Sequence, residues 1–140
     1  MFEFLGLFAD PVAGLQARLL RRWPEVDIVE IASPFPAVAV RFPGSIYDAA
    51  DAYLPVSVTA EITSLSPLYP GVRFLLLRTH CWGGDCFNRG QLIRDGQVAY
   101  QTDGEEALRR LIDQFGVDIG AKEIFPPLRR GFPWKASAPG

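Results

Sequence analysis

The sequence is poor in the side chains that carry sulfur and imidazole chemistry. Its 140 residues include only two cysteines and one histidine. Two cysteines are too few for a disulfide framework, and one histidine cannot supply both members of a histidine-based acid–base pair. His80, Cys81 and Cys86 all lie within a stretch of seven residues. Any chemistry based on thiols or imidazole is therefore confined to residues 80–86.

Recognisable catalytic and nucleotide-binding motifs are also missing. The chain has no glycine-rich phosphate loop, no dinucleotide fingerprint and no Gly-x-Ser-x-Gly nucleophile elbow. We therefore expect no cofactor and favour a protein that is not an enzyme. Carboxylates that converge only in the folded chain are one remaining way to form an enzymatic site.

Charge and hydropathy argue against nucleic-acid and membrane partners. With 14 basic and 16 acidic side chains, the net charge is −2, so the chain has no overall basic character. No apolar run approaches the roughly 20 residues that cross a bilayer. The first ten residues also lack the basic start of a secretory signal. These features predict a cytoplasmic protein.

The last twenty residues differ from the rest of the chain. Residues 121–140 are proline-rich and hold four basic side chains against one acidic side chain, a net charge of +3, whereas residues 1–120 carry −5. Phe125, Phe132 and Trp134 are costly to leave in water. We therefore expect an extended tail that packs on the body of the protein.

Length and composition predict a single α+β domain spanning residues 1–140. The chain is 49% apolar and 21% charged, as is usual for globular proteins. Helical periodicity with start and stop signals marks residues 11–22 and 104–115, and a short helix is expected at 46–53. We expect an antiparallel sheet of about five or six strands, with both main helices on one face. Strand patterns occur at residues 26–31, 37–42, 56–63, 72–81, 86–93 and 97–101.

The dipeptide Gly83-Gly84 predicts the register of the hairpin that holds the cysteines. Two glycines between strand patterns favour a two-residue hairpin turn. The cysteines then form a non-hydrogen-bonded pair, in which side chains come closest, so a disulfide is geometrically allowed. This turn places Trp82 opposite Asp85, Cys81 opposite Cys86, His80 opposite Phe87 and Arg78 opposite Arg89.

Side-chain alternation in the same register places His80 on the face opposite the two cysteines. That separation disfavours a metal site, because a structural zinc site needs four converging ligands. It also disfavours a thiol nucleophile activated by His80. Cytoplasmic thiols are usually reduced, so free thiols are expected ahead of a disulfide. A thiol switch or metal site at Cys81 and Cys86 remains an alternative.

The other face of this hairpin is the candidate binding surface, and we expect it to be exposed. Arg78 and Arg89 lie opposite each other there and repel. Asp85, a carboxylate from elsewhere or a bound anion should offset that repulsion. Aromatic side chains beside arginines are typical of protein–protein contacts. The candidate residues are Arg78, His80, Trp82, Asp85, Phe87 and Arg89.

The leading hypothesis is a small, non-enzymatic domain that binds a protein partner through the face and turn of the meander at residues 72–101. An immunity protein that neutralises a toxin, or an adaptor, fits this class. The alternative is a small-molecule, anion or enzymatic site around Arg78, His80 and Arg89. The missing catalytic features favour this class of function.

Overall fold

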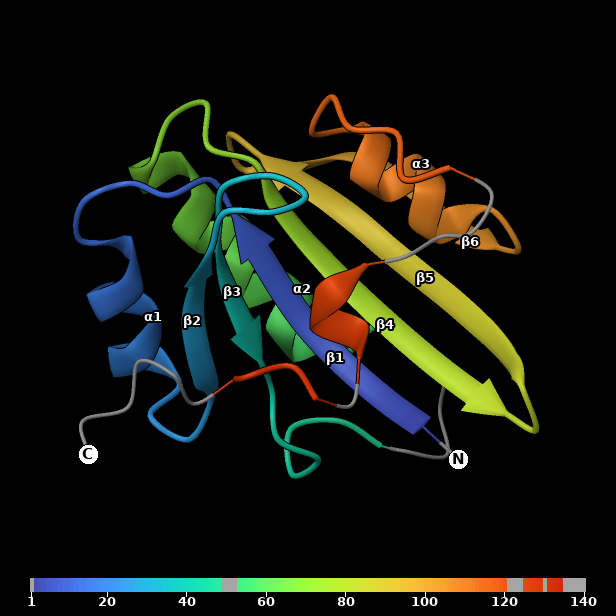
Figure 1. Cartoon of the computed structure of the whole chain (residues 1–140). Coiled ribbons are helices and arrows are strands. Elements are labelled where there is room, and N and C mark those ends of the chain that lie inside the picture. The colour runs from blue at the N-terminus through green and yellow to red at the C-terminus, as the bar shows by residue number, and fades with distance from the viewer. Residues whose placement is uncertain (1, 49–52, 121–124, 130, 135–140) are drawn as a thin grey trace.

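The computed structural model describes residues 2–48, 53–120, 125–129 and 131–134. Its strands form one antiparallel sheet in the order β2-β3-β1-β4-β5-β6 (Figure 1). This is the α+β fold with an antiparallel sheet that the sequence predicts. The strands are β1 (Phe2–Ala9), β2 (Asp27–Ile31), β3 (Ala37–Arg41), β4 (Phe74–Trp82), β5 (Asp85–Arg94) and β6 (Gln97–Gly104). The helices are α1 (Leu15–Arg22), α2 (Val56–Leu65) and α3 (Ala107–Asp113), with 3-10 turns at Ser66–Leu68 and Pro126–Leu128.

β1 lies in the middle of the sheet, although the sequence pattern predicted no element there. It pairs with β3 on one side and β4 on the other. Every residue from Phe4 to Ala9 is buried. A strand buried on both faces is apolar without interruption, so it lacks the alternation that identifies half-buried strands. Residues 2–9 are therefore a central strand that the sequence pattern did not predict.

The strand predicted at 56–63 is wrong, because these residues form α2. Val58 and Ile62, four residues apart, are the buried positions of this helix, whereas Val56 is 83% exposed. Packing at helical spacing overrides the strand preference of β-branched residues. The short helix predicted at 46–53 is also not seen. Residues 46–48 are not helical, and residues 49–52 lie outside the described residues.

The two main helices lie on opposite faces of the sheet, which corrects the prediction that they share one. Leu15 and Leu19 of α1 pack in a cluster with Val58 and Ile62 of α2. Leu111 and the other apolar residues of α3 belong to a second cluster. Both faces need cover because alternate residues of β1 point to each cluster. Figure 1 shows α2 behind the sheet, with α3 on the viewer's side.

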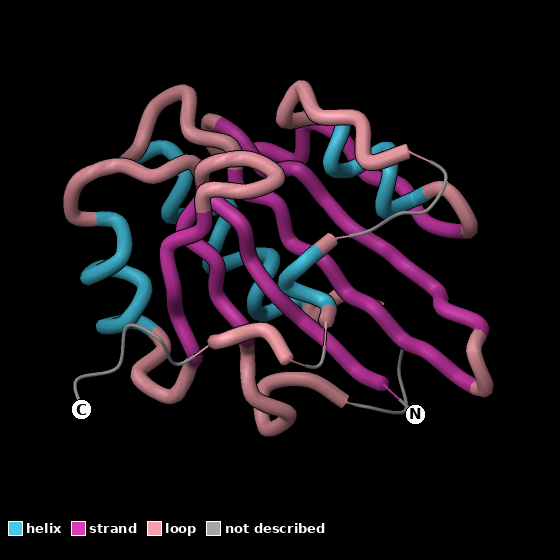
Figure 2. The backbone as a smooth tube through the Cα atoms, viewed as in Figure 1, coloured by secondary structure: helices cyan, strands magenta, loops and turns pink. Residues whose placement is uncertain are grey.

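The C-terminal segment packs on the same face as α3. Phe125 and Trp134 are buried in the second cluster, and Phe132 is partly buried against it. The ring of Phe125 lies 4.9 Å from that of Phe8, measured between centroids. Figure 2 shows part of this segment as a short helical turn that crosses in front of the strands. Residues 121–124, 130 and 135–140 of the predicted tail lie outside the described residues.

Gly90 on β5 shows how closely the sheet and α3 approach. A Cβ atom at this position would lie 2.5 Å from Cδ1 of Leu111 and 2.9 Å from the carbonyl oxygen of Leu76. The Leu111 side chain can move, but the Leu76 backbone is held in the sheet between β1 and β5. A side chain at position 90 would therefore push α3 or the sheet out of place.

We predict that Gly90→Ala lowers the free energy of unfolding by about 1–3 kcal/mol, the usual cost of overpacking. Urea denaturation followed by circular dichroism measures it. Gly44→Ala is the matched control, because no atom lies within 4 Å of a Cβ at that position. The control should stay within about 0.5 kcal/mol of wild type. Equal unfolding midpoints for the two variants would contradict this account of the interface.

Candidate functional site

The turn between β4 and β5 has the predicted register. Trp82 pairs with Asp85, Cys81 with Cys86 and Arg78 with Arg89. Gly83 and Gly84 have φ values of 53° and 93°, the left-handed conformations that a type I′ hairpin turn requires. The prediction that these two glycines form the bend is confirmed. The turn lies at one end of the sheet, away from the three helices (Figure 1).

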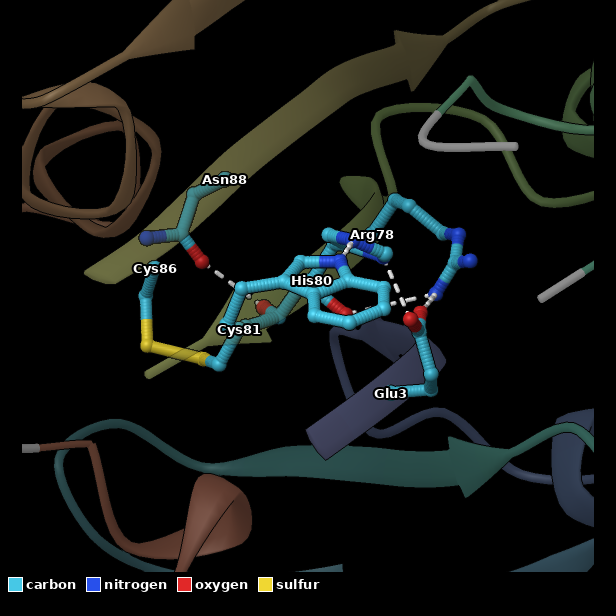
Figure 3. Close-up of a disulfide and its surroundings, with 8 residues drawn as sticks. Glu3, Arg78, His80, Cys81, Cys86 and Asn88 are labelled. Carbon is cyan, nitrogen blue, oxygen red and sulfur yellow. Dashed lines mark hydrogen bonds and ion pairs between the residues drawn. A yellow bond between two sulfur atoms is a disulfide. The ribbon is translucent and has the colours of Figure 1, made fainter. Parts of the chain in front are cut away.

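Cys81 and Cys86 are joined by a disulfide, with their Cα atoms 4.0 Å apart (Figure 3). The predicted register allows this bond, although free thiols were expected ahead of it. The cysteines share a sheet face with Thr79, whose hydroxyl donates a 2.7 Å hydrogen bond to the side-chain oxygen of Asn88. His80 projects to the opposite face, as its register predicts. Among the described residues, no three His, Cys, Asp or Glu side chains form a group suited to a metal ion.

Arg78 is completely buried, which corrects the expectation that it lies on an exposed surface. Its Nη1 lies 2.7 Å from Oε2 of Glu3 and donates to the carbonyl oxygens of Phe4 and Thr79, each at 3.2 Å. The guanidinium carbon lies 4.5 Å from the ring centroid of Tyr47. Arg78 therefore joins β1 to β4 beneath the segment that contains Tyr47.

Glu3 is the central residue of this cluster, although no motif in the sequence marks it as a site residue. Its Oε2 pairs with Arg78, and its Oε1 contacts Nδ1 of His80. The indole Nε1 of Trp82 contacts Nε2 of the same imidazole. Because an indole nitrogen can only donate, Nε2 is the acceptor in this contact. Figure 3 shows the Glu3 carboxylate between Arg78 and His80.

This chain of contacts, which we call the Glu3 relay, runs from buried Arg78 through Glu3 and His80 to Trp82. Trp82 is 60% exposed, whereas the side chain of His80 is only 14% exposed. Both imidazole nitrogens are engaged within the protein, so the ring offers neither nitrogen to a substrate. The arrangement positions an exposed tryptophan.

Arg89 has its own counter-charge. Its Nη2 lies 3.3 Å from Oδ2 of Asp103 on β6, and its guanidinium carbon lies 4.3 Å from the ring centroid of Tyr53. A carboxylate from elsewhere was one of the predicted ways to offset repulsion between Arg78 and Arg89. Glu3 supplies it for Arg78, and Asp103 for Arg89. The anion-site alternative is weaker, because each arginine already faces a carboxylate.

A hollow of about 610 Å³ opens beside Arg89. One wall comes from the segment before α2, where Tyr53 is 62% exposed, and the floor comes from β5 and β6. Its surface contains both apolar side chains and hydrogen-bonding groups, as binding pockets usually do. Its lining residues are Tyr53, Leu54, Val56, Arg89, Gly90, Gln91, Gln101, Thr102 and Asp103.

The other predicted site residues lie at or near the surface. Asp85 is exposed at the turn, and Phe87 is half-buried with its ring 5.4 Å from the Arg89 guanidinium carbon. Of the six candidates, Arg78 alone lies in the core. Tyr47 lies against Arg78 and is half-buried. Burial raises the pKa of its phenol above the ordinary value, although the positive charge of Arg78 acts in the opposite direction.

No protein-family model, curated protein or solved structure matches the chain. Function therefore has to be argued from the side chains of the site. None of the helices in the described ranges is both long and apolar enough to cross a membrane.

We predict that Arg78→Met destabilises the fold by about 3–5 kcal/mol, because it leaves the Glu3 carboxylate without its closest buried cation. The double variant Arg78→Met with Glu3→Gln should recover part of this loss, since no unpaired charge is then buried. Thermal and urea unfolding measure both effects.

The exposed pair between Arg22 and Glu61 is the control for this experiment. Its Nη2 and Oε1 atoms lie 2.9 Å apart, but both side chains are about half exposed. Water screens such a pair, so Arg22→Met should change stability far less than Arg78→Met. Equal losses at the two positions, or strictly additive losses in the double variant, would contradict the assigned role of Glu3.

Proposed function

We propose that the protein is a non-enzymatic domain that binds a protein partner through its tip surface. The tip surface consists of Trp82, Asp85, Phe87 and Arg89, together with Tyr53, which packs against Arg89. All of these residues except Tyr53 belong to the meander formed by β4, β5 and β6. Neutralising a toxin, as an immunity protein does, or acting as an adaptor is the form of this function that we favour.

The observation that carries the proposal is an exposed tryptophan held by buried charged groups. Trp82 is 60% exposed, yet its indole nitrogen is bound to His80 and, through it, to Glu3. Tryptophan, tyrosine and arginine dominate the binding energy of protein interfaces. A side chain already fixed in one orientation loses little conformational entropy when a partner binds.

The backbone around Trp82 is also constrained. The disulfide joins the residue before Trp82 to the residue after Asp85, so it closes the hairpin across the turn. A rigid loop raises affinity by reducing the ordering that binding would otherwise require. Rigidity and exposed aromatic area together support recognition of a protein, and the engaged imidazole argues against catalysis.

We predict that Trp82→Ala abolishes capture of the partner while leaving the melting temperature nearly unchanged. The tagged protein is used to capture partners from a lysate of its source cells, and captured proteins are quantified by mass spectrometry. Arg89→Ala should weaken the same capture. Leu68→Ala is the control, because Leu68 is also exposed (57%) but lies outside the tip surface. A partner captured equally well by wild type and Trp82→Ala would remove the basis for this surface.

The second candidate function is a small-molecule site, and the hollow beside Arg89 is the observation that favours it. A ligand with one anionic group would compete with Asp103 for Arg89, so binding should be weak. We predict no rise in melting temperature with millimolar inorganic phosphate or citrate. A rise that disappears in Arg89→Gln but persists in Arg94→Gln, an exposed arginine outside the hollow, would favour the ligand site instead.

A further inference from the structure

β6 forms an open edge of the sheet. Within the described part of the chain it pairs with β5 alone and ends the strand order. Its side chains are largely exposed at residues 97–99, 101 and 103. An edge strand carries unpaired backbone N–H and C=O groups, which form a template for another strand.

The register shows which backbone groups of β6 point outward. The pair beside a two-residue turn is hydrogen-bonded, and pairs then alternate along the hairpin. The pair formed by Arg89 and its β4 partner is one of the hydrogen-bonded pairs, so the backbone N–H and C=O of Arg89 point to β4. Those of its neighbour Gly90 point the other way, to β6. Gly90 pairs with Thr102, so the backbone groups of Thr102 point into the sheet. Those of Gln101 and Asp103 point outward.

The opposite edge of the sheet is protected, and β6 is not. β2 has five residues, carries Asp27 and Glu30, and lies between Pro24 and Pro34. Short length, charge and flanking prolines all discourage strand pairing. β6 has eight residues, no proline and no lysine. Its single charged side chain, Asp103, already pairs with Arg89.

A register shift near Ala99 limits the regular part of β6. The shift lies between Leu92 and Ile93 on β5, where pairing moves from Tyr100 to Val98 on β6. Residues 100–104 remain in regular register with β5. Thr102 lies at the centre of this segment, with its outward-facing neighbours Gln101 and Asp103 on either side.

We propose that two copies of the chain associate by antiparallel pairing of their β6 strands, with the twofold axis at Thr102. This register places Gln101 opposite Asp103 of the second copy, so the outward backbone groups meet as hydrogen-bonded pairs. An amide then faces a carboxylate, and no like charges lie opposite each other. Thr102 faces its own equivalent, where two hydroxyls can bond.

The position of the regular segment and the residues on either side of Thr102 favour a second copy of the chain over a peptide from another protein. Because the regular segment is centred on Thr102, each contact between Gln101 and Asp103 occurs twice in a symmetric pair. An axis at Asp103 would instead place two carboxylates opposite each other. The pairing uses the edge of the sheet and not the tip surface, so it can be tested without any partner.

The register is tested with Thr102→Cys. The described residues hold no free cysteine, so the new thiol has no neighbour to react with in its own chain. In the proposed dimer two such thiols form a non-hydrogen-bonded pair, the same type of position that Cys81 and Cys86 occupy. Mild oxidation with copper phenanthroline should give a disulfide-linked dimer on a non-reducing gel. Gln101→Cys and Asp103→Cys, whose thiols would not face each other, should cross-link much less. Equal cross-linking of all three would overturn the register.

Association itself is tested by sedimentation equilibrium. The wild-type mass should rise with concentration toward twice the 15.5 kDa of one chain. Gln101→Pro should remain monomeric yet folded, because the N–H that it removes points outward. Thr102→Pro removes an inward donor and should lower the melting temperature. Wild-type protein that stays monomeric at every concentration would overturn the proposal, including the case in which a peptide from another protein occupies the edge.

Discussion

The ion pair between Glu3 and Arg78 is the interaction on which the rest of the site depends. Arg78 is completely buried, and a buried guanidinium requires a counter-charge and several hydrogen-bond acceptors. β1 provides both, through the Glu3 carboxylate and the Phe4 carbonyl. The same carboxylate then orients His80, which holds Trp82 at the surface. A charged group in the core thereby determines the orientation of the most prominent exposed aromatic side chain at the end of the sheet.

The two-layered core explains why this end of the sheet is available for binding. Aliphatic residues of α1 and α2 cover one face, while an aromatic-rich cluster with α3 and the C-terminal segment covers the other. On the α1 and α2 face, the sheet beyond the helices is covered by Glu3, Arg78 and Tyr47 instead of by a helix. Ion pairs and polar contacts fill this region, and aromatic side chains lie exposed at its rim. The tip surface therefore lies at the end of the sheet that the helices do not cover.

Both proposed contacts use the meander of β4, β5 and β6, but they use different groups. The tip surface presents side chains at the turn between β4 and β5, whereas the proposed pairing uses backbone groups of β6. Arg89 and Asp103 connect the two regions, because their ion pair links β5 to β6 beside the hollow. Side chains make the contact at the tip, whereas backbone groups make it at the edge, where Gln101 and Asp103 favour a second copy of the chain.

The structural features that the sequence alone predicts correctly are those that depend on neighbouring residues. Gly83-Gly84 specifies a tight turn, and that turn sets the cross-strand pairs and the opposite faces of His80 and the cysteines, because side chains alternate along a strand. The positions of β1 and α2 were decided by tertiary structure. Residues 2–9 pair with strands more than 25 residues away in the sequence, and Val58 and Ile62 form a helix because the sheet offers them a surface. The pairing of Glu3 with Arg78, and thus the burial of Arg78, depends on that distant strand pairing and leaves no local pattern in the sequence.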